Sequence, residues 1–367
     1  MFKQYKLNNY KFILVLFVVI LNVIGILLIG SAKPSVQGKQ IVGMIAGLSI
    51  MVILSLIDYN FILKFAWLIY LFMLGTLLLV MFAGDDAGGA QRWFEIGGFR
   101  FQPSELAKIL IILFFAYFFM KHEEKINTPK VLIMSLILAG IPLALILKQP
   151  DLSTTIVTAL IFAALLFVAG LSYKIVVGVL AVSVPSAIIL FTLLIQDKLP
   201  FIKSYQVTRV MAWLYPDDYP ADAYQQQNSI MAIGSGQLWG KGLNNTDATS
   251  VKNGNFIPEP QTDFIFAVAG EELGFIGTVI IIILLLFITI ECILIARKAK
   301  DTAGKMICCG FAALVGFQSL VNIGVASGVL PNTGLPLPFV SYGLTSLLSL
   351  YIGVGLVLNV GLQPKKY

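Results

Sequence analysis

The feature that most constrains this sequence is a set of long apolar runs that contain no Asp, Glu, Lys or Arg. A helix needs about 20 apolar residues to cross the hydrocarbon core of a membrane. Five charge-free runs are close to this length or exceed it, at 12–32, 40–57, 65–84, 152–173 and 175–196. Because a backbone in lipid must satisfy its own hydrogen bonds, each run predicts a transmembrane helix.

Five more spans follow from less regular segments. The stretch 306–364 is charge-free and long enough for two helices, which the Pro- and Gly-rich segment 331–339 separates. The segments 105–120, 131–147 and 264–296 each hold a further apolar run, although the first and the last contain ionisable residues. The sequence therefore predicts an all-α polytopic membrane protein with about ten transmembrane helices.

The composition agrees with a chain surrounded by lipid. Apolar residues make up 58% of the sequence and charged residues 12%, whereas soluble domains have about half and a quarter. We predict a single membrane domain over residues 1–367, with a large extracytoplasmic loop at 197–263 between the seventh and eighth helices. The first run, at 12–32, is longer than the apolar core of a signal peptide, which favours a retained anchor.

The distribution of basic residues predicts the orientation of the chain. Ten spans place both termini on one side, and fourteen Lys and Arg residues flank the spans on that side. The short segments on the other side hold six Lys and Arg residues. The long loop is left out of this count, because long loops have little influence on orientation. Both termini are therefore expected in the cytoplasm. This topology accounts for the net charge of +6 without a nucleic-acid partner.

The unusual polar residues gather on the predicted outer side. Four outer segments are rich in Gly, Pro, aromatic and ionisable residues, namely 84–108, 148–155, 197–263 and 328–346. The cytoplasmic loops are short and plain by comparison. Loops that carry such residues over a rigid scaffold are typical of functional sites, so the outer face is the expected location of the site.

Glu105 and Lys108 are three residues apart, so they share one face of the helix that begins after Pro103 and Ser104. One interpretation is structural: Ser104 would cap the helix, and Lys108 would extend its ammonium to the interface. The other is functional, because ionisable residues inside a span are costly and usually mark a site.

Asp151 and Asp263 each precede an apolar run, so each carboxylate is a candidate helix cap or a candidate site residue. In the structural alternative, either Thr262 or Asp263 is the N-cap residue of the helix that follows. A carboxylate at the boundary of water and lipid can have a pKa raised into the range of a general base. In the long loop, the segment 200–216 alternates apolar residues with basic ones, among them Arg209, and predicts an interfacial amphipathic helix.

These segments resemble the SEDS family (shape, elongation, division and sporulation) over nearly the whole chain. The matching motifs, in order, are GAQRW at 89–93, FQPSELAK at 101–108, KQPDLSTT at 148–155, AIGSGQLWGKGL at 232–243, IPEPQTDFIFAVAGEELGFIG at 257–277 and LPLPFVSYG at 335–343. The second and third resemble the rod-elongation branch, RodA, more than the division branch, FtsW. The chain departs from the family's usual residues at Ser153, Gln237, Gln261 and Leu344.

The resemblance implies a peptidoglycan glycosyltransferase that polymerises lipid II at the outer face of the bacterial cytoplasmic membrane. It implies that Asp263 is the family's essential acidic residue and that Glu105, Lys108 and Asp151 line a cavity. It also implies a partner, a class B penicillin-binding protein that crosslinks the product. A division or sporulation role with the same chemistry is the nearest alternative.

The expected chemistry assigns a role to each candidate. Asp263 would deprotonate an acceptor hydroxyl, while Lys108, Arg92 and Arg209 would bind the departing diphosphate. Asp263 and Asp151 also offer the oxygen ligands that Mg²⁺ or Mn²⁺ prefers, and the sequence does not decide whether a divalent cation takes part. The rival functions are a lipid II carrier, or flippase, and a scaffold without catalysis. Neither an inverted repeat nor a polar break at the membrane midplane supports a carrier.

Overall fold

The computed structural model describes residues 9–86, 91–96, 99–195, 204–245, 250, 254 and 256–363. In these ranges ten long helices occupy the predicted spans: α1 (Phe12–Ala32), α2 (Pro34–Leu56), α4 (Ala66–Ala83), α5 (Pro103–Lys121), α6 (Pro129–Lys148), α7 (Leu152–Val168), α8 (Tyr173–Ile195), α11 (Ile265–Arg297), α12 (Thr302–Ala326) and α13 (Leu344–Leu362). Eight are long and apolar enough to cross a membrane, and α7 and α8 are the other two. The prediction of a polytopic helical membrane protein is confirmed.

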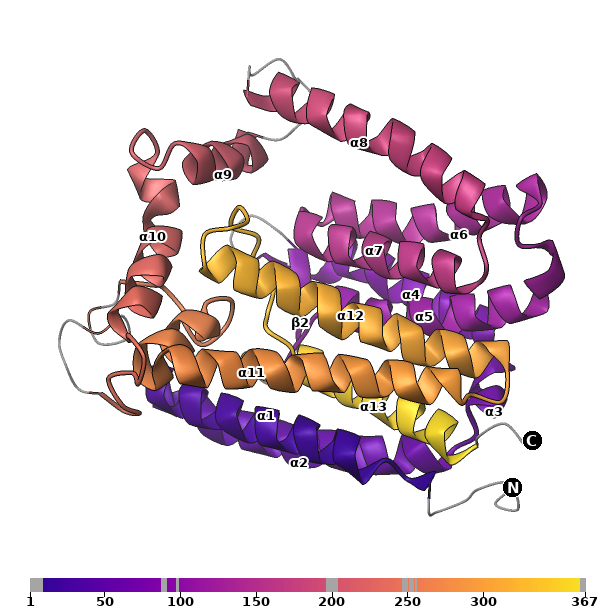
Figure 1. The fold of residues 1–367 in the computed structure, drawn as a ribbon, viewed down its shortest axis with the longest axis horizontal. Coiled ribbons are helices and arrows are strands. Elements are labelled where there is room, and N and C mark those ends of the chain that lie inside the picture. The colour runs from indigo at the N-terminus through magenta and orange to yellow at the C-terminus, as the bar shows by residue number, and fades with distance from the viewer. Residues whose placement is uncertain are drawn as a thin grey trace.

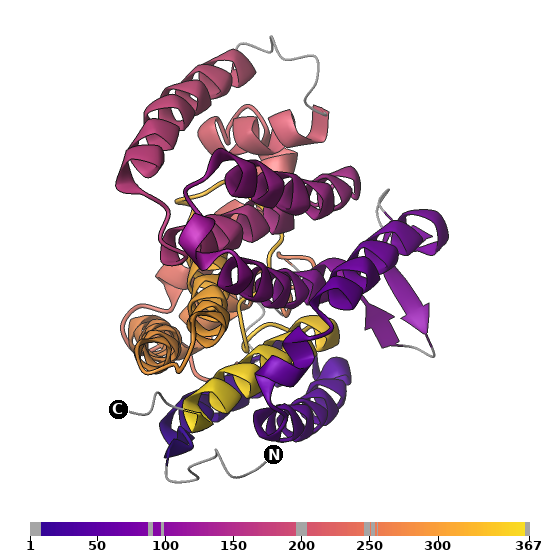
Figure 2. The same cartoon turned by 90° about the vertical axis from the view of Figure 1, so that its right-hand side faces the viewer.

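Short elements connect these helices. They are α3 (Tyr59–Leu63), the 3₁₀ helix η3 (Glu123–Lys125), α9 (Ser204–Leu214), α10 (Pro220–Ser235) and three strands, β1 (Asp85–Asp86), β2 (Gln91–Ile96) and β3 (Phe99–Phe101). The strands form one antiparallel sheet in the order β1-β2-β3, which lies beside α4 (Figure 2). The predicted amphipathic helix is present as α9, while its first residues, 200–203, lie outside the described residues. The sheet and α10 were not predicted.

The centre of the bundle consists of α5, α12 and α13. In α5 and α13, 78% of the most apolar 18-residue window is buried, against 28% in α2, α4 and α6, so the latter face the surroundings. Helix α12 contacts α5, α7, α11 and α13. Helix α8 lies at the periphery, where it contacts α9 (Figure 1).

The loop between α12 and α13, residues 327–343, is held by side chains from six helices. Each side chain donates a hydrogen bond to a backbone carbonyl, which satisfies groups that the loop itself leaves unpaired. The donors are Asn22 of α1, Gln40 of α2, Ser153 of α7, Trp213 of α9, Gln226 of α10, and Gln318 and Asn322 of α12. The α12–α13 loop is therefore fixed by the whole bundle.

Helix α11 is interrupted at Gly274, whose φ of 67° and ψ of −166° are not helical. The segment 236–242 fills the break with backbone hydrogen bonds: the N–H of Lys241 donates to the carbonyl of Glu271 at 2.9 Å, and the N–H of Phe275 donates to the carbonyl of Gln237 at 2.8 Å. Gln237 itself has a φ of 50°, in the left-handed region that favours the glycine usual in the family.

Replacing Gly274 with alanine should destabilise the protein by about 2 kcal/mol or more. Its φ and ψ are nearly restricted to glycine, and a Cβ would lie 2.7 Å from the carbonyl oxygen of Leu238. The matched control is Gly140→Ala in α6, where nothing lies within 4 Å of the new Cβ, so stability should change by less than about 1 kcal/mol. Thermal unfolding in detergent measures both, and equal melting temperatures would contradict the prediction.

Candidate active site

A cavity of about 280 Å³ brings together four of the six predicted site residues, Arg92, Glu105, Asp151 and Asp263. They come from β2, the start of α5, the start of α7 and the segment before α11, so the fold collects residues far apart in the sequence. The rest of the lining comes mainly from the α12–α13 loop and α13. These residues are Trp93, Gln102, Thr154, Thr262, Gly334, Leu335, Pro336, Tyr342, Gly343, Thr345 and Ser346.

Asp263 is a half-buried carboxylate in the wall of the cavity. The pKa of the carboxyl group is raised to about 6, mainly by burial and also by the nearby charges of Asp151 and Glu105, while Arg209 opposes the shift. On one side the carboxylate rests against Gly334, where a Cβ would lie 3.2 Å from Oδ2. A carboxylate with this pKa is ionised at neutral pH and still basic enough to accept a proton.

Capping does not explain Asp263. Helix α11 starts at Ile265, and its N-cap residue is Phe264, whose side chain makes no capping hydrogen bond. The interpretation that Thr262 or Asp263 caps this helix is therefore wrong. The backbone carbonyl of Asp263 instead accepts a hydrogen bond of 2.7 Å from Nδ2 of Asn322 on α12.

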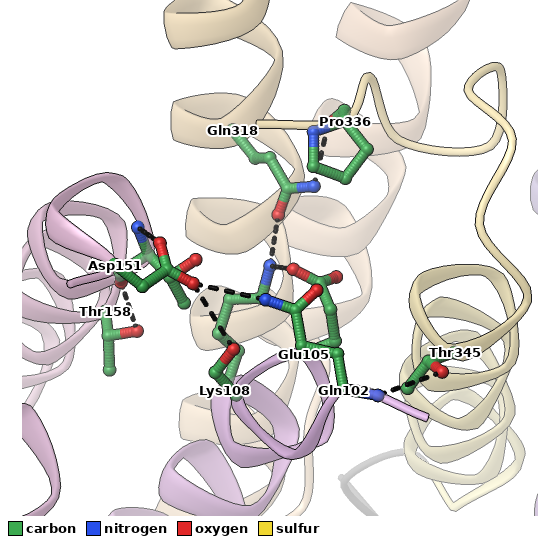
Figure 3. A network of polar contacts seen from close by, with 10 residues as sticks. Gln102, Glu105, Lys108, Asp151, Thr158, Gln318, Pro336 and Thr345 are labelled. Atoms are coloured by element: carbon green, nitrogen blue, oxygen red, sulfur yellow. Dashed lines mark hydrogen bonds and ion pairs between the residues drawn. The ribbon is translucent and has the colours of Figure 1, made fainter. Parts of the chain in front are cut away.

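Lys108 lies behind Glu105, away from lipid and water. The side chain is almost completely buried, and Nζ donates to Oε1 of Glu105 at 2.8 Å and to Oε1 of Gln318 at 2.7 Å (Figure 3). The expectation that Lys108 extends to the interface is wrong, because its ammonium points to a buried carboxylate. Glu105 reaches the cavity wall and Lys108 supplies its counter-charge.

Asp151 caps α7 and lines the cavity. Its Oδ1 accepts the backbone N–H of Thr154 at 3.1 Å and so caps α7, while Oδ2 accepts from Gln102 at 3.2 Å and from Ser104 at 3.5 Å. Figure 3 shows the contact of Asp151 with Gln102. Ser104 is not the N-cap of α5, which has Gln102 at that position and no side-chain cap.

The two arginines occupy different positions. Arg92 lines the cavity, and its guanidinium donates to the backbone carbonyls of Gln149 and Pro150. Those bonds fix it beside Asp151 at the end of α6. Arg209 is exposed on α9, near enough to Asp263 to lower the pKa of that carboxyl group. Both cations can thus act on an anion that enters the cavity.

The cavity does not form a metal site from protein ligands alone. In the described ranges, no three His, Cys, Asp or Glu side chains are arranged to hold a metal ion. A divalent cation bound by Asp263 and Asp151 would take its further ligands from water or a bound anion. The predicted Mg²⁺ or Mn²⁺ stays a prediction.

Four polar residues of the site were missed by the sequence analysis. Gln318 and Asn322 lie on α12 and contact Lys108 and the backbone of Asp263. Gln102 and Thr345 meet at the cavity, where the N–H of Gln102 donates to Oγ1 of Thr345 at 3.3 Å. The two amides in the otherwise apolar stretch 306–326 were the available signal, because polar side chains in a span are usually buried against a partner.

The arrangement defines a class of protein: a multi-pass helical membrane protein with a charged cavity at one end of the bundle. Comparison with known proteins places it further. The family model described as "Cell cycle protein", FTSW_RODA_SPOVE, matches residues 6–366. The chain therefore belongs to the FtsW/RodA/SpoVE family, and the predicted membership of the SEDS family is confirmed.

Two curated relatives cover most of the chain. A protein of Geobacter sp. (strain M18) named probable peptidoglycan glycosyltransferase FtsW is 33% identical over 98% of this chain and 99% of its own length. The peptidoglycan glycosyltransferase MrdB of Escherichia coli (strain K12) is 38% identical over 88% of this chain and 85% of its own length. Both branches of the family are thus represented among the relatives.

Two solved structures have the same fold. One, described as "Structural coordination of polymerization and crosslinking by a peptidoglycan synthase complex", matches with a TM-score of 0.78 and 31% identity over 96% of this chain and 97% of the other. The rod shape determining protein RodA of Thermus thermophilus matches with a TM-score of 0.68 and 28% identity, over 96% of both chains.

Proposed function

We propose that this protein is a peptidoglycan glycosyltransferase that polymerises lipid II at the outer face of the bacterial cytoplasmic membrane. The observation that carries the proposal is that Asp263, Glu105, Asp151 and Arg92 line the same cavity. The relatives named peptidoglycan glycosyltransferases support the same reaction class.

In the proposed reaction, Asp263 accepts the proton of the GlcNAc 4-hydroxyl of one lipid II. The hydroxyl oxygen then forms a bond to the anomeric carbon of the donor glycan, while the bond from that carbon to the diphosphate breaks. The electron pair leaves with the polyprenyl diphosphate. Arg92 and Arg209 stabilise this anion, and Lys108 contributes a fixed positive charge from behind Glu105.

We assign the protein to cell elongation. The FQPSELAK and KQPDLSTT segments and the 38% identity to MrdB support this role, while relatives named FtsW keep division as the alternative. A class B penicillin-binding protein is the proposed partner, supported by the similar structure of a complex for polymerisation and crosslinking.

Polymerisation distinguishes an enzyme from a carrier. The purified protein with its partner should convert fluorescent lipid II into glycan strands, which a gel resolves by length. If the protein moved lipid II across liposomes and made no polymer, the carrier function would replace the proposed one.

The activity should decrease as the pH falls through about 6. The base must be ionised, and Asp263, with a pKa of about 6, is largely ionised at pH 7 and about one-tenth ionised at pH 5, so the rate at pH 5 should be about tenfold lower. Arg209→Gln should move the midpoint upward, because Arg209 lowers the pKa of Asp263. Initial rates at several pH values measure both, and an unchanged rate at pH 5 would exclude a catalytic base with a pKa of about 6.

Cysteine labelling in intact cells tests the proposed orientation, in which both termini are cytoplasmic. Asp218 and Glu124 are exposed, and they follow α9 and α5 at opposite ends of the bundle. In a variant whose native cysteines are replaced by alanine, Asp218→Cys should react with an impermeant thiol reagent and Glu124→Cys should not. The reverse result would put the cavity in the cytoplasm.

A further inference from the structure

Two amide side chains on α12 connect the α12–α13 loop to the charged residues of the cavity. Gln318 and Asn322 are four residues apart, so they lie on the same face of the helix. Both are buried, at 0% and 2% exposure. Gln318 accepts from Lys108 and donates to the carbonyl of Pro336 at 2.8 Å.

Asn322 holds two backbone segments at once. Its Nδ2 donates to the carbonyl of Leu335 at 2.6 Å and to the carbonyl of Asp263 at 2.7 Å. Leu335 and Gly334 line the cavity, and the Asp263 carboxylate rests against Gly334. The amide therefore fixes the distance between the backbone that carries the carboxylate and the wall that supports it.

Asn322 contributes to the site as a hydrogen-bond donor. Two carbonyls within 2.7 Å require its NH₂ group. Its Oδ1 is buried and has no hydrogen-bond partner among the described residues, a condition that is unfavourable to stability. A leucine would fill similar space without that unsatisfied oxygen, so packing alone does not account for an asparagine here.

We propose that Asn322 is a positioning residue for glycosyl transfer, which holds the backbone of Asp263 so that its carboxylate meets the acceptor hydroxyl. The proposal rests on the proposed function, in which Asp263 is the base. A displacement of about 1 Å in a reacting group can reduce the rate about 100-fold. Loss of this hydrogen bond should therefore reduce kcat, while lipid II binding through the cations is unaffected.

The test compares two buried asparagines that hold the same loop. Asn22 of α1 donates to the carbonyl of Phe339 at 2.8 Å, and it does not line the cavity. Kinetics of lipid II polymerisation and melting temperatures are measured for Asn322→Leu and Asn22→Leu. We expect Asn322→Leu to lower kcat by roughly 10- to 100-fold with KM changed less than about twofold, and Asn22→Leu to keep kcat within about threefold.

Equal losses of kcat in the two variants, or a rise of KM alone in Asn322→Leu, would overturn the positioning role. If Asn322→Leu fails to fold, Asn322→Ser keeps one donor, and its kcat should lie between those of the wild type and an Asp263→Asn protein. Asp263→Asn in the same assay separates the two proposals. If it is active, the catalytic assignment fails; if it is inactive and Asn322→Ser or Asn322→Leu has normal kcat, only the positioning role fails.

Discussion

The Asp263→Asn protein should fold, insert and bind its partner, yet form glycan polymer 10²- to 10⁴-fold more slowly than the wild type. An amide has nearly the same size and cannot accept the proton of the acceptor hydroxyl. Stability should change little, because Asp263 is not the N-cap residue of α11, which is Phe264. Polymerisation of fluorescent lipid II by purified protein measures the loss.

Asp218→Asn is the control for this experiment. Asp218 is an exposed carboxylate between α9 and α10, outside the cavity lining. Its replacement removes one negative charge from the same region of the chain and should leave the rate unchanged. A wild-type rate for Asp263→Asn, or an equal loss in both variants, would refute the assignment of Asp263 as the base.

The second large effect is expected at Lys108. Lys108→Met leaves the carboxylate of Glu105 buried without its ion pair, which typically costs about 3–5 kcal/mol of stability. The double variant Lys108→Met with Glu105→Gln removes both charges and should recover much of that stability. Activity should stay low, because the cavity wall loses the carboxylate of Glu105 and the ammonium group behind it.

A second ion pair, partly buried, provides the control. Lys241 and Glu271 are 2.8 Å apart, with side chains 25% and 3% exposed, and neither lines the cavity. Lys241→Met with Glu271→Gln makes the same chemical change outside the site and should keep most of the polymerisation activity. The Glu105–Lys108 pair would be purely structural if both double variants melted at similar temperatures and made similar amounts of polymer.

The membrane helices were predictable because a span depends on a local property, the length of an apolar run. The predicted 12–32 and 105–120, for example, became Phe12–Ala32 and Pro103–Lys121. The sheet was missed because its strands are short and lie in a segment judged only by its polar composition. The pair Gly97-Gly98 between two aromatic stretches was an available hairpin signal.

The site was predictable where charge or local spacing marks it. Glu105 and Lys108 share a helix face, and their ion pair follows from that spacing. The partner that completes it, Gln318, is 210 residues away and uncharged, so no local pattern connects it to Lys108. The same holds for Asn322, whose contact with Asp263 depends on how α12 packs beside the start of α11.

The anchoring of the α12–α13 loop has a consequence for biogenesis. Spans are translated in order and domains fold from the N-terminus during synthesis. The cavity is lined by residues of β2, α5 and α7 and also by Thr345 and Ser346 at the start of α13. The last span must leave the ribosome and pack against α2 and α5 before the wall is complete. A nascent chain therefore has no complete cavity until α13 enters the membrane.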